Sequence, residues 1–167
     1  MPPRQIHLRV GAMATVVAFL FAGCASSSDQ MDAARFVNEH VAGTARAATA
    51  TKALEADVSR LSSSPTGPQL ERLARAAREG RRNVVQVGEW NVAEGGEEED
   101  LPRAEAEVTE GANELANAMS ALLGYARAPT AAALTRYESE LAHGREEWNG
   151  GISQLWYLAH ESNPPTV

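Results

Sequence analysis

Three breaks rich in glycine, proline and serine divide the chain beyond residue 30 into four stretches of similar length. This division constrains the fold more than any other feature of the sequence. The breaks fall at residues 62–68, 95–102 and 128–130. Glycine and proline interrupt regular helices, and short connections join antiparallel neighbours. The chain therefore has room for four long elements joined by tight turns.

Apolar residues in each stretch recur at spacings of three and four, which is the helical period. The last stretch shows this most clearly, with Leu134, Tyr137, Leu141, Trp148, Ile152 and Leu155. We predict helices over about 30–62, 68–93, 101–127 and 130–161, in one bundle domain over 30–163 followed by a tail at 164–167. The fold class is all-α: an antiparallel up-down-up-down four-helix bundle after a cleaved N-terminal signal peptide. Much of the core-facing surface is alanine, which predicts closely approaching helices.

Residues at the helix ends agree with these limits. Asp29 and Thr130 are good N-caps for the first and fourth helices, and Pro68 suits the first turn of the second. The second helix has the weakest pattern, because Gly80 and Gly88 each cost about 1 kcal/mol relative to alanine inside a helix. A lone strand there would have no partner, so a helix is predicted.

An apolar segment at residues 10–22 follows the basic residues Arg4 and Arg9. Its length suits the core of a secretory signal and is too short to span a bilayer. Directly after it comes Cys24, the only cysteine in the chain. A single cysteine cannot form an intramolecular disulfide bond, so its presence in an exported protein needs another explanation.

The run Phe21-Ala22-Gly23-Cys24 resembles the lipobox of bacterial lipoproteins, although phenylalanine stands where leucine is usual. The resemblance covers about the first 25 residues. It implies that a diacylglyceryl group is attached to the thiol of Cys24 and that residues 1–23 are removed as a signal peptide. Residues 24–29 would then be a short tether to the membrane. Two alternatives remain: ordinary secretion with cleavage after Ala25, and a retained apolar anchor or a cytoplasmic protein.

Charge restricts the partners of this chain. The net charge falls from −7 to −9 when Arg4 and Arg9 leave with the leader. An acidic chain of this kind is not expected to bind nucleic acid or to adhere electrostatically to anionic lipid. Arginine far outnumbers lysine, which suggests a GC-rich genome such as that of an actinobacterium. We expect a protein held on the extracytoplasmic face of the cell membrane by its acyl chains.

Two pairs of residues have the types found among metal or haem ligands. Glu140 and His143 match the Glu-x-x-His element of di-iron bundles, but a second such element is missing from the sequence. His40 and Met119 are a weak pair of axial haem ligands. The acidic run 97–100 lacks the spacing of a calcium loop. No catalytic, cofactor-binding or metal-binding residue is therefore assigned, and Cys24 is the single predicted modification site.

The predicted helix at 68–93 carries a basic stripe, which consists of Arg72, Arg75, Arg78 and Arg82. One interpretation is an anion site for phosphate groups of the envelope. The favoured interpretation is ion pairing across to acidic residues of the third helix, namely Glu107, Glu110 and Glu114.

Several aromatic side chains are expected at the end of the bundle nearest Cys24. They are Trp90, Trp148, Trp156 and Tyr157. They could form an interfacial belt or a partner site. Because the acidic loop at 94–100 lies at the same end, packing into the core is the favoured interpretation.

These features favour a non-enzymatic, lipid-anchored helical bundle that binds an envelope protein partner or supports the envelope. The alternative is an exported bundle that binds a small ligand or a metal. A hydrolase acting on envelope polymers has least support, because a thin-cored bundle has little room for a deep cleft.

Replacing Cys24 with alanine should release the protein from the membrane fraction. One acyl chain alone binds only marginally, whereas several chains give stable anchoring, so loss of the acylation site removes the anchor. Cell fractionation and mass spectrometry of the N-terminus check this. An unmodified N-terminus at Ser26 in the wild-type protein would overturn the lipoprotein interpretation.

Overall fold

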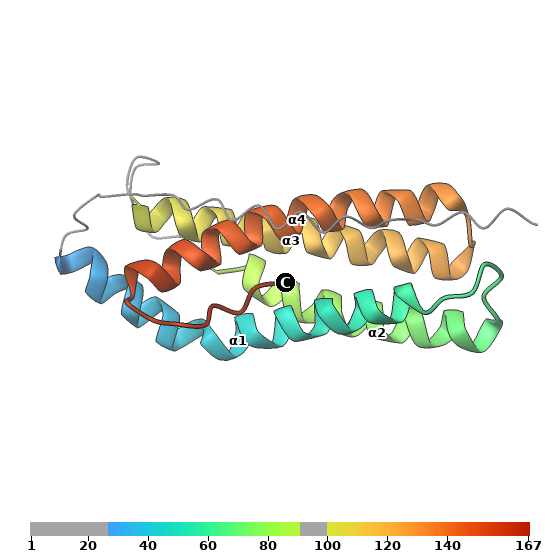
Figure 1. Ribbon diagram of the computed structural model, residues 1–167, viewed down its shortest axis with the longest axis horizontal. Helices are drawn as coiled ribbons and strands as arrows, with labels where there is room; N and C mark the ends of the chain where they lie inside the picture. Colours follow the sequence, from blue (N-terminus) through green and yellow to red (C-terminus); the bar gives the residue numbers. More distant parts are fainter. Residues whose placement is uncertain (1–26, 91–99) are drawn as a thin grey trace, which may run out of the picture.

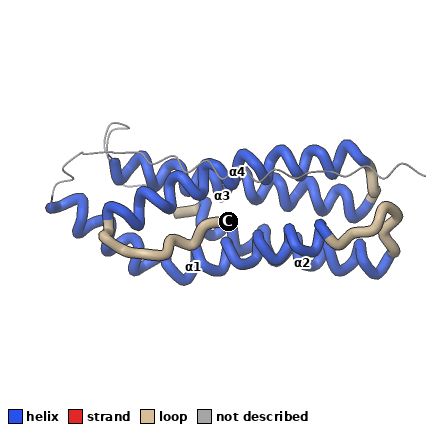
Figure 2. Tube along the Cα trace, viewed as in Figure 1, coloured by secondary structure: helices blue, strands red, loops and turns tan. Residues whose placement is uncertain are grey.

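The computed structural model describes residues 27–90 and 100–167, and the leader, Cys24 and the loop 91–99 lie outside them. The described part contains four helices: α1 (Ser27–Ser59), α2 (Gly67–Gly88), α3 (Asp100–Arg127) and α4 (Ala131–Leu158). Figure 1 and Figure 2 show them side by side in one elongated bundle, with no strand among the described residues. The prediction of an all-α, four-helix fold is confirmed.

Successive helices run in opposite directions, so that α1 and α3 point one way and α2 and α4 the other (Figure 1). The packing is uneven. The α3–α4 pair is the most extensive, followed by α2–α3 and α1–α2, whereas α1 and α4 meet over a short stretch. An ion pair between Arg145 and Glu55 links α4 to α1 there. At 22 residues, α2 is shorter than the other helices, so it covers only part of the length of α3.

The α3–α4 contact brings the two backbones together at three glycines. A Cβ atom on Gly111 would lie 2.4 Å from the backbone N of Trp148. One on Gly144 would lie 2.8 Å from the N of Leu115, and one on Gly151 would lie 2.6 Å from a backbone oxygen of α3. Such distances exclude any side chain, so these glycines set how closely α3 and α4 approach.

Around this contact the core consists of side chains with almost no exposure. The largest are Trp148, Leu54, Leu73, Leu115, Met119, Leu122, Ile152 and Leu155. Several fully buried positions are alanines, as the predicted thin core requires; they include Ala33, Ala47, Ala77, Ala104, Ala112 and Ala118. Closely spaced helices therefore replace large side chains as the source of dense packing.

Gly80 and Gly88, the two glycines that weaken the helical pattern of α2, also face other helices. A Cβ atom on Gly80 would meet Sδ of Met119 at 3.0 Å, and one on Gly88 would meet the side-chain oxygen of Asn113 at 2.8 Å. The helix prediction for this stretch is confirmed as far as Gly88, where α2 ends, whereas the predicted end at 93 lies outside the described residues. The low helix propensity of these glycines has a packing reason.

The helix ends agree with most of the sequence expectations. The side chain of Thr130 accepts a hydrogen bond from the N–H of Ala133 at 3.2 Å, and Pro68 lies in the first turn of α2. Asp29 is not an N-cap, because α1 begins at Ser27 and Asp29 lies inside the helix. At its other end α4 stops at Leu158, since His160 takes a left-handed conformation with φ 56°.

Replacing Gly111 with alanine should lower the free energy of unfolding by about 2–3 kcal/mol, because the added methyl group forces two backbones apart. Gly124 is the matched control on the same helix, because nothing lies within 4 Å of its added Cβ. Gly124→Ala should raise stability by about 0.5–1 kcal/mol through helix propensity alone. Urea unfolding followed by circular dichroism distinguishes the two, and equal effects would contradict the close contact.

Candidate functional site

Glu140 and His143, the pair that matches a Glu-x-x-His element, lie on α4 near a second carboxylate, Glu114 of α3. A side-chain hydrogen bond with Glu140, followed by burial, raises the pKa of Glu114 above its usual range. Glu140 also lies 3.4 Å from the guanidinium of Arg136. Among the residues that the structure describes, no group of three acidic, histidine or cysteine side chains is placed to hold a metal ion.

His40 and Met119 lie at different levels of the bundle. The ring of His40 stacks on Trp90 with 4.0 Å between centroids, and burial lowers the pKa of His40. Met119 instead contacts Gly80, close to Ala50 of α1. His40 lies ten residues before Ala50 on α1, about 15 Å away at 1.5 Å per residue. The structure therefore does not bring His40 and Met119 together.

The aromatic residues named in the sequence analysis differ in how deeply they are buried. Trp148 and Trp156 are buried, with 0% and 4% of their surfaces exposed, and Tyr157 is 65% exposed. Trp90 is half-buried against α1, where it stacks on His40 and meets Phe36 edge-on at 5.3 Å. Core packing, the favoured interpretation, accounts for both buried tryptophans.

The predicted ion pairs between the α2 arginines and the α3 glutamates are wrong, and the register of the helices explains why. Since Gly88 faces Asn113 and Gly80 faces Met119, the glutamates lie level with the end of α2 or beyond it. Glu107 instead lies beside Arg103 and Glu147, and Glu114 beside Glu140. None of the four arginines forms an ion pair within residues 27–90 and 100–167.

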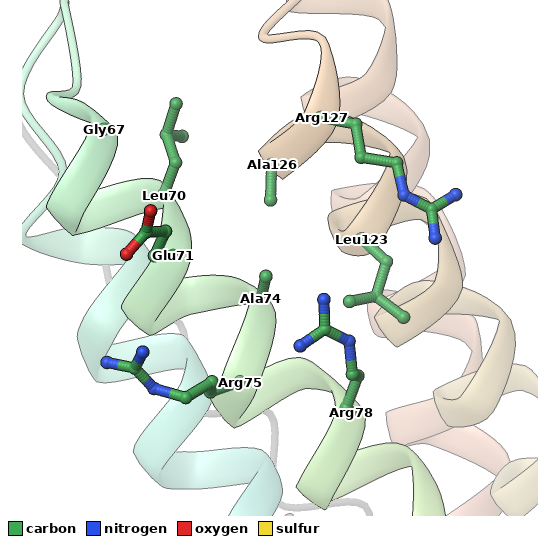
Figure 3. A pocket seen from close by; sticks show the side chains of 9 residues that line it. All are labelled: Gly67, Leu70, Glu71, Ala74, Arg75, Arg78, Leu123, Ala126 and Arg127. Atoms are coloured by element: carbon green, nitrogen blue, oxygen red, sulfur yellow. The ribbon is translucent and has the colours of Figure 1, made fainter.

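Two of these arginines line a concavity of about 500 Å³ between α2 and α3, which we call the basic groove. Its residues are Gly67, Leu70, Glu71, Ala74, Arg75, Arg78, Leu123, Ala126 and Arg127. In Figure 3 the guanidinium of Arg78 reaches into the space between the helices, while those of Arg75 and Arg127 extend outward on opposite sides. A floor of leucine and alanine side chains is thus bordered by three positive charges and one negative charge.

The other members of the stripe lie elsewhere. Arg72 lines a smaller hollow between α1 and α2 with Asp57 and Arg60, and Arg82 is exposed. The sequence-based interpretation did not include Arg127, although the position of this residue at the end of α3 indicates that it lies near the start of α2. In an antiparallel pair the last turn of α3 lies beside the first turns of α2, which is where Arg75 and Arg78 are found.

The basic groove suits an anionic occupant that also has apolar groups. Guanidinium groups bind carboxylates through paired hydrogen bonds, and the leucines would cover an apolar side chain. Comparisons with known protein families, with curated proteins and with solved structures gave no match. Among the described helices, none is long and apolar enough to cross a membrane.

Replacing Glu140 with glutamine should return the pKa of Glu114 toward its usual value. A raised folded-state pKa stabilises the fold at acidic pH, and that contribution is lost as the pH rises above the usual carboxyl range. As the pH rises from 4 to 7, the free energy of unfolding of the variant should therefore fall less than that of the wild type. NMR titration of the Glu114 carboxyl carbon and urea unfolding check this. Glu146→Gln, an exposed change on the same helix, should leave both measurements unaltered.

Proposed function

We propose that this protein is a lipid-anchored, extracytoplasmic and non-enzymatic interaction module. In this proposal acyl chains on Cys24 hold the bundle at the membrane, and the basic groove binds an acidic segment of another envelope protein. The observation that carries the proposal is the groove itself. Arg75, Arg78 and Arg127 border an apolar floor in a chain whose net charge is negative, and none of the three has an ion-pair partner in the described part of the chain.

Unpaired arginines at a concave surface favour an anionic partner. An arginine that already pairs with a glutamate would have to give up that bond before binding anything else. Arg75 and Arg78 have no such bond to lose within residues 27–90 and 100–167. The net negative charge of the chain repels an acidic partner at long range, so attraction to such a partner is confined to the positive charge at the groove.

The position of the groove favours a protein partner over the lipids of the anchoring membrane. The groove lies at the start of α2 and the end of α3, which is the end of the bundle opposite the start of α1 (Figure 1). α1 contains 33 residues, so the two ends are about 50 Å apart at 1.5 Å per residue. Since α1 already begins at Ser27, the predicted tether shortens from 24–29 to the residues 24–26, which would hold the start of α1 near the bilayer with the groove facing away from it.

The alternative, a bundle that binds a small ligand or a metal, has less support. Such a site would need polar groups and space inside the core. The α3–α4 backbones instead meet directly at Gly111 and Gly144, and Trp148 occupies the core without exposed surface.

The double variant Arg75→Glu/Arg78→Glu should weaken binding of an acidic, leucine-containing peptide by about tenfold or more, because it reverses charge beside the partner. The measurement is fluorescence anisotropy with a labelled peptide of alternating glutamate and leucine. It uses residues 24–167 with Cys24→Ser, which contain all four helices. Binding to the unchanged groove should also weaken as salt is added.

The control is Arg72→Glu/Arg82→Glu, which changes the charge equally on the same helix but leaves the groove residues intact. It should alter affinity by no more than about twofold, as expected for charges outside the contact. Equal loss in both variants would indicate attraction by net charge alone and would contradict the proposed site. Binding to anionic phospholipid vesicles in preference to the peptide would contradict a protein partner.

A further inference from the structure

Residues 159–167 do not extend away from the bundle but turn back along it (Figure 1). Two non-glycine residues make the reversal, His160 with φ 56° and Asn163 with φ 63°. The left-handed region is unfavourable for residues with a Cβ atom, though less so for asparagine and histidine than for most others. The reversal therefore costs some conformational free energy, and hydrogen bonds made by later residues of the segment must offset it.

Those bonds come from two neighbouring residues of α4, which we call the Trp148–Asn149 clasp. The indole N–H of Trp148 donates to the carbonyl oxygen of Pro165 at 2.9 Å. The side-chain oxygen of Asn149 accepts from the N–H of Val167 at 2.8 Å, and its amide donates to the carbonyl of Val167 at 3.1 Å. Val167 is only 9% exposed and belongs to the core.

The clasp recognises backbone atoms of the segment that ends at Val167, which includes a tight turn in which the N–H of Thr166 donates to the carbonyl oxygen of Pro164 at 2.9 Å. An asparagine amide has one acceptor and two donors, so it can pair with both the N–H and the C=O of one residue. These bonds require only that the segment adopt this backbone conformation and that Val167 fit its buried position. They do not require that the segment belong to the same molecule as the clasp.

We propose that the Trp148–Asn149 clasp also accepts residues 163–167 of a second copy, so that two copies exchange these segments reciprocally. The second copy is the occupant favoured by the structure, because its segment has the sequence that already fits. Straightening the chain at His160 and Asn163 would release their left-handed conformations while every clasp bond is re-formed. Reciprocal exchange gives a closed two-fold dimer and leaves no clasp empty.

This inference does not depend on the proposed function. If both are correct, anchoring in one membrane would favour exchange, since tethered copies meet at a raised effective concentration. The basic groove lies on α2 and α3 and would stay accessible in the exchanged dimer, because the clasp and the segment it holds belong to α4 and the residues after it.

A complementation experiment tests the exchange. One variant, Asn149→Ala, keeps the segment and breaks its own clasp. The other, a chain ending at Ser162, keeps the clasp and lacks the segment. Both are made as residues 24–167 or 24–162 with Cys24→Ser. Mixing them should give a 1:1 complex by native mass spectrometry that neither variant forms alone, together with a shift in tryptophan fluorescence.

The control mixture combines the shortened chain with a shortened chain that also carries Asn149→Ala, so that no segment is available. A 1:1 complex in the first mixture and none in the control supports exchange. No complex at millimolar concentration, or equal complex in both mixtures, overturns it. If the shortened chain does not fold by circular dichroism, Val167→Asp replaces it, because a carboxylate would not enter the buried position.

The wild-type chain supplies the last measurement. Sedimentation velocity over a concentration series should show a dimer that disappears in the Val167→Asp variant. A wild-type protein that stays monomeric up to millimolar concentration would overturn the proposal, and so would a dimer that persists unchanged in the variant.

Discussion

The close approach of α3 and α4 is the contact on which the rest of the bundle depends. Gly111, Gly144 and Gly151 let the two backbones meet at distances that no side chain would tolerate. Dispersion forces between closely packed atoms are individually small, but they sum over the full length of two long helices. A bundle rich in alanine gains its packing density from this approach, since it has few large side chains with which to fill a wider gap.

The other helices are positioned relative to this pair. α2 packs mainly on α3, where Gly80 and Gly88 fit against Met119 and Asn113. That fit sets the register of α2, and the register decides which side chains of α2 and α3 lie level with one another. The basic groove follows from it, because Arg75 and Arg78 come to lie beside the last turn of α3 while Glu107 and Glu114 of α3 face α4.

Two sides of the bundle differ in the sign of the charges that they carry. On the α3–α4 flank, like charges face each other, and a hydrogen bond with Glu140, followed by burial, raises the pKa of Glu114. On the α2–α3 flank, arginines border an apolar floor without carboxylate partners among the described residues. The acidic flank stabilises the fold less at neutral pH than at acidic pH. The basic flank is the surface to which we assign binding.

The sequence by itself determined the four helices, their order and their approximate ends, because helical periodicity and Gly/Pro breaks are local signals. It also carried the predicted acylation of Cys24, which lies outside the described residues. Only the tertiary structure decided the register of α2 against α3, and with it the basic groove that includes Arg127. It also showed residues 159–167 packed against Trp148 and Asn149. Register and long-range docking depend on how side chains of distant segments fit together, and a local pattern in one segment does not encode that fit.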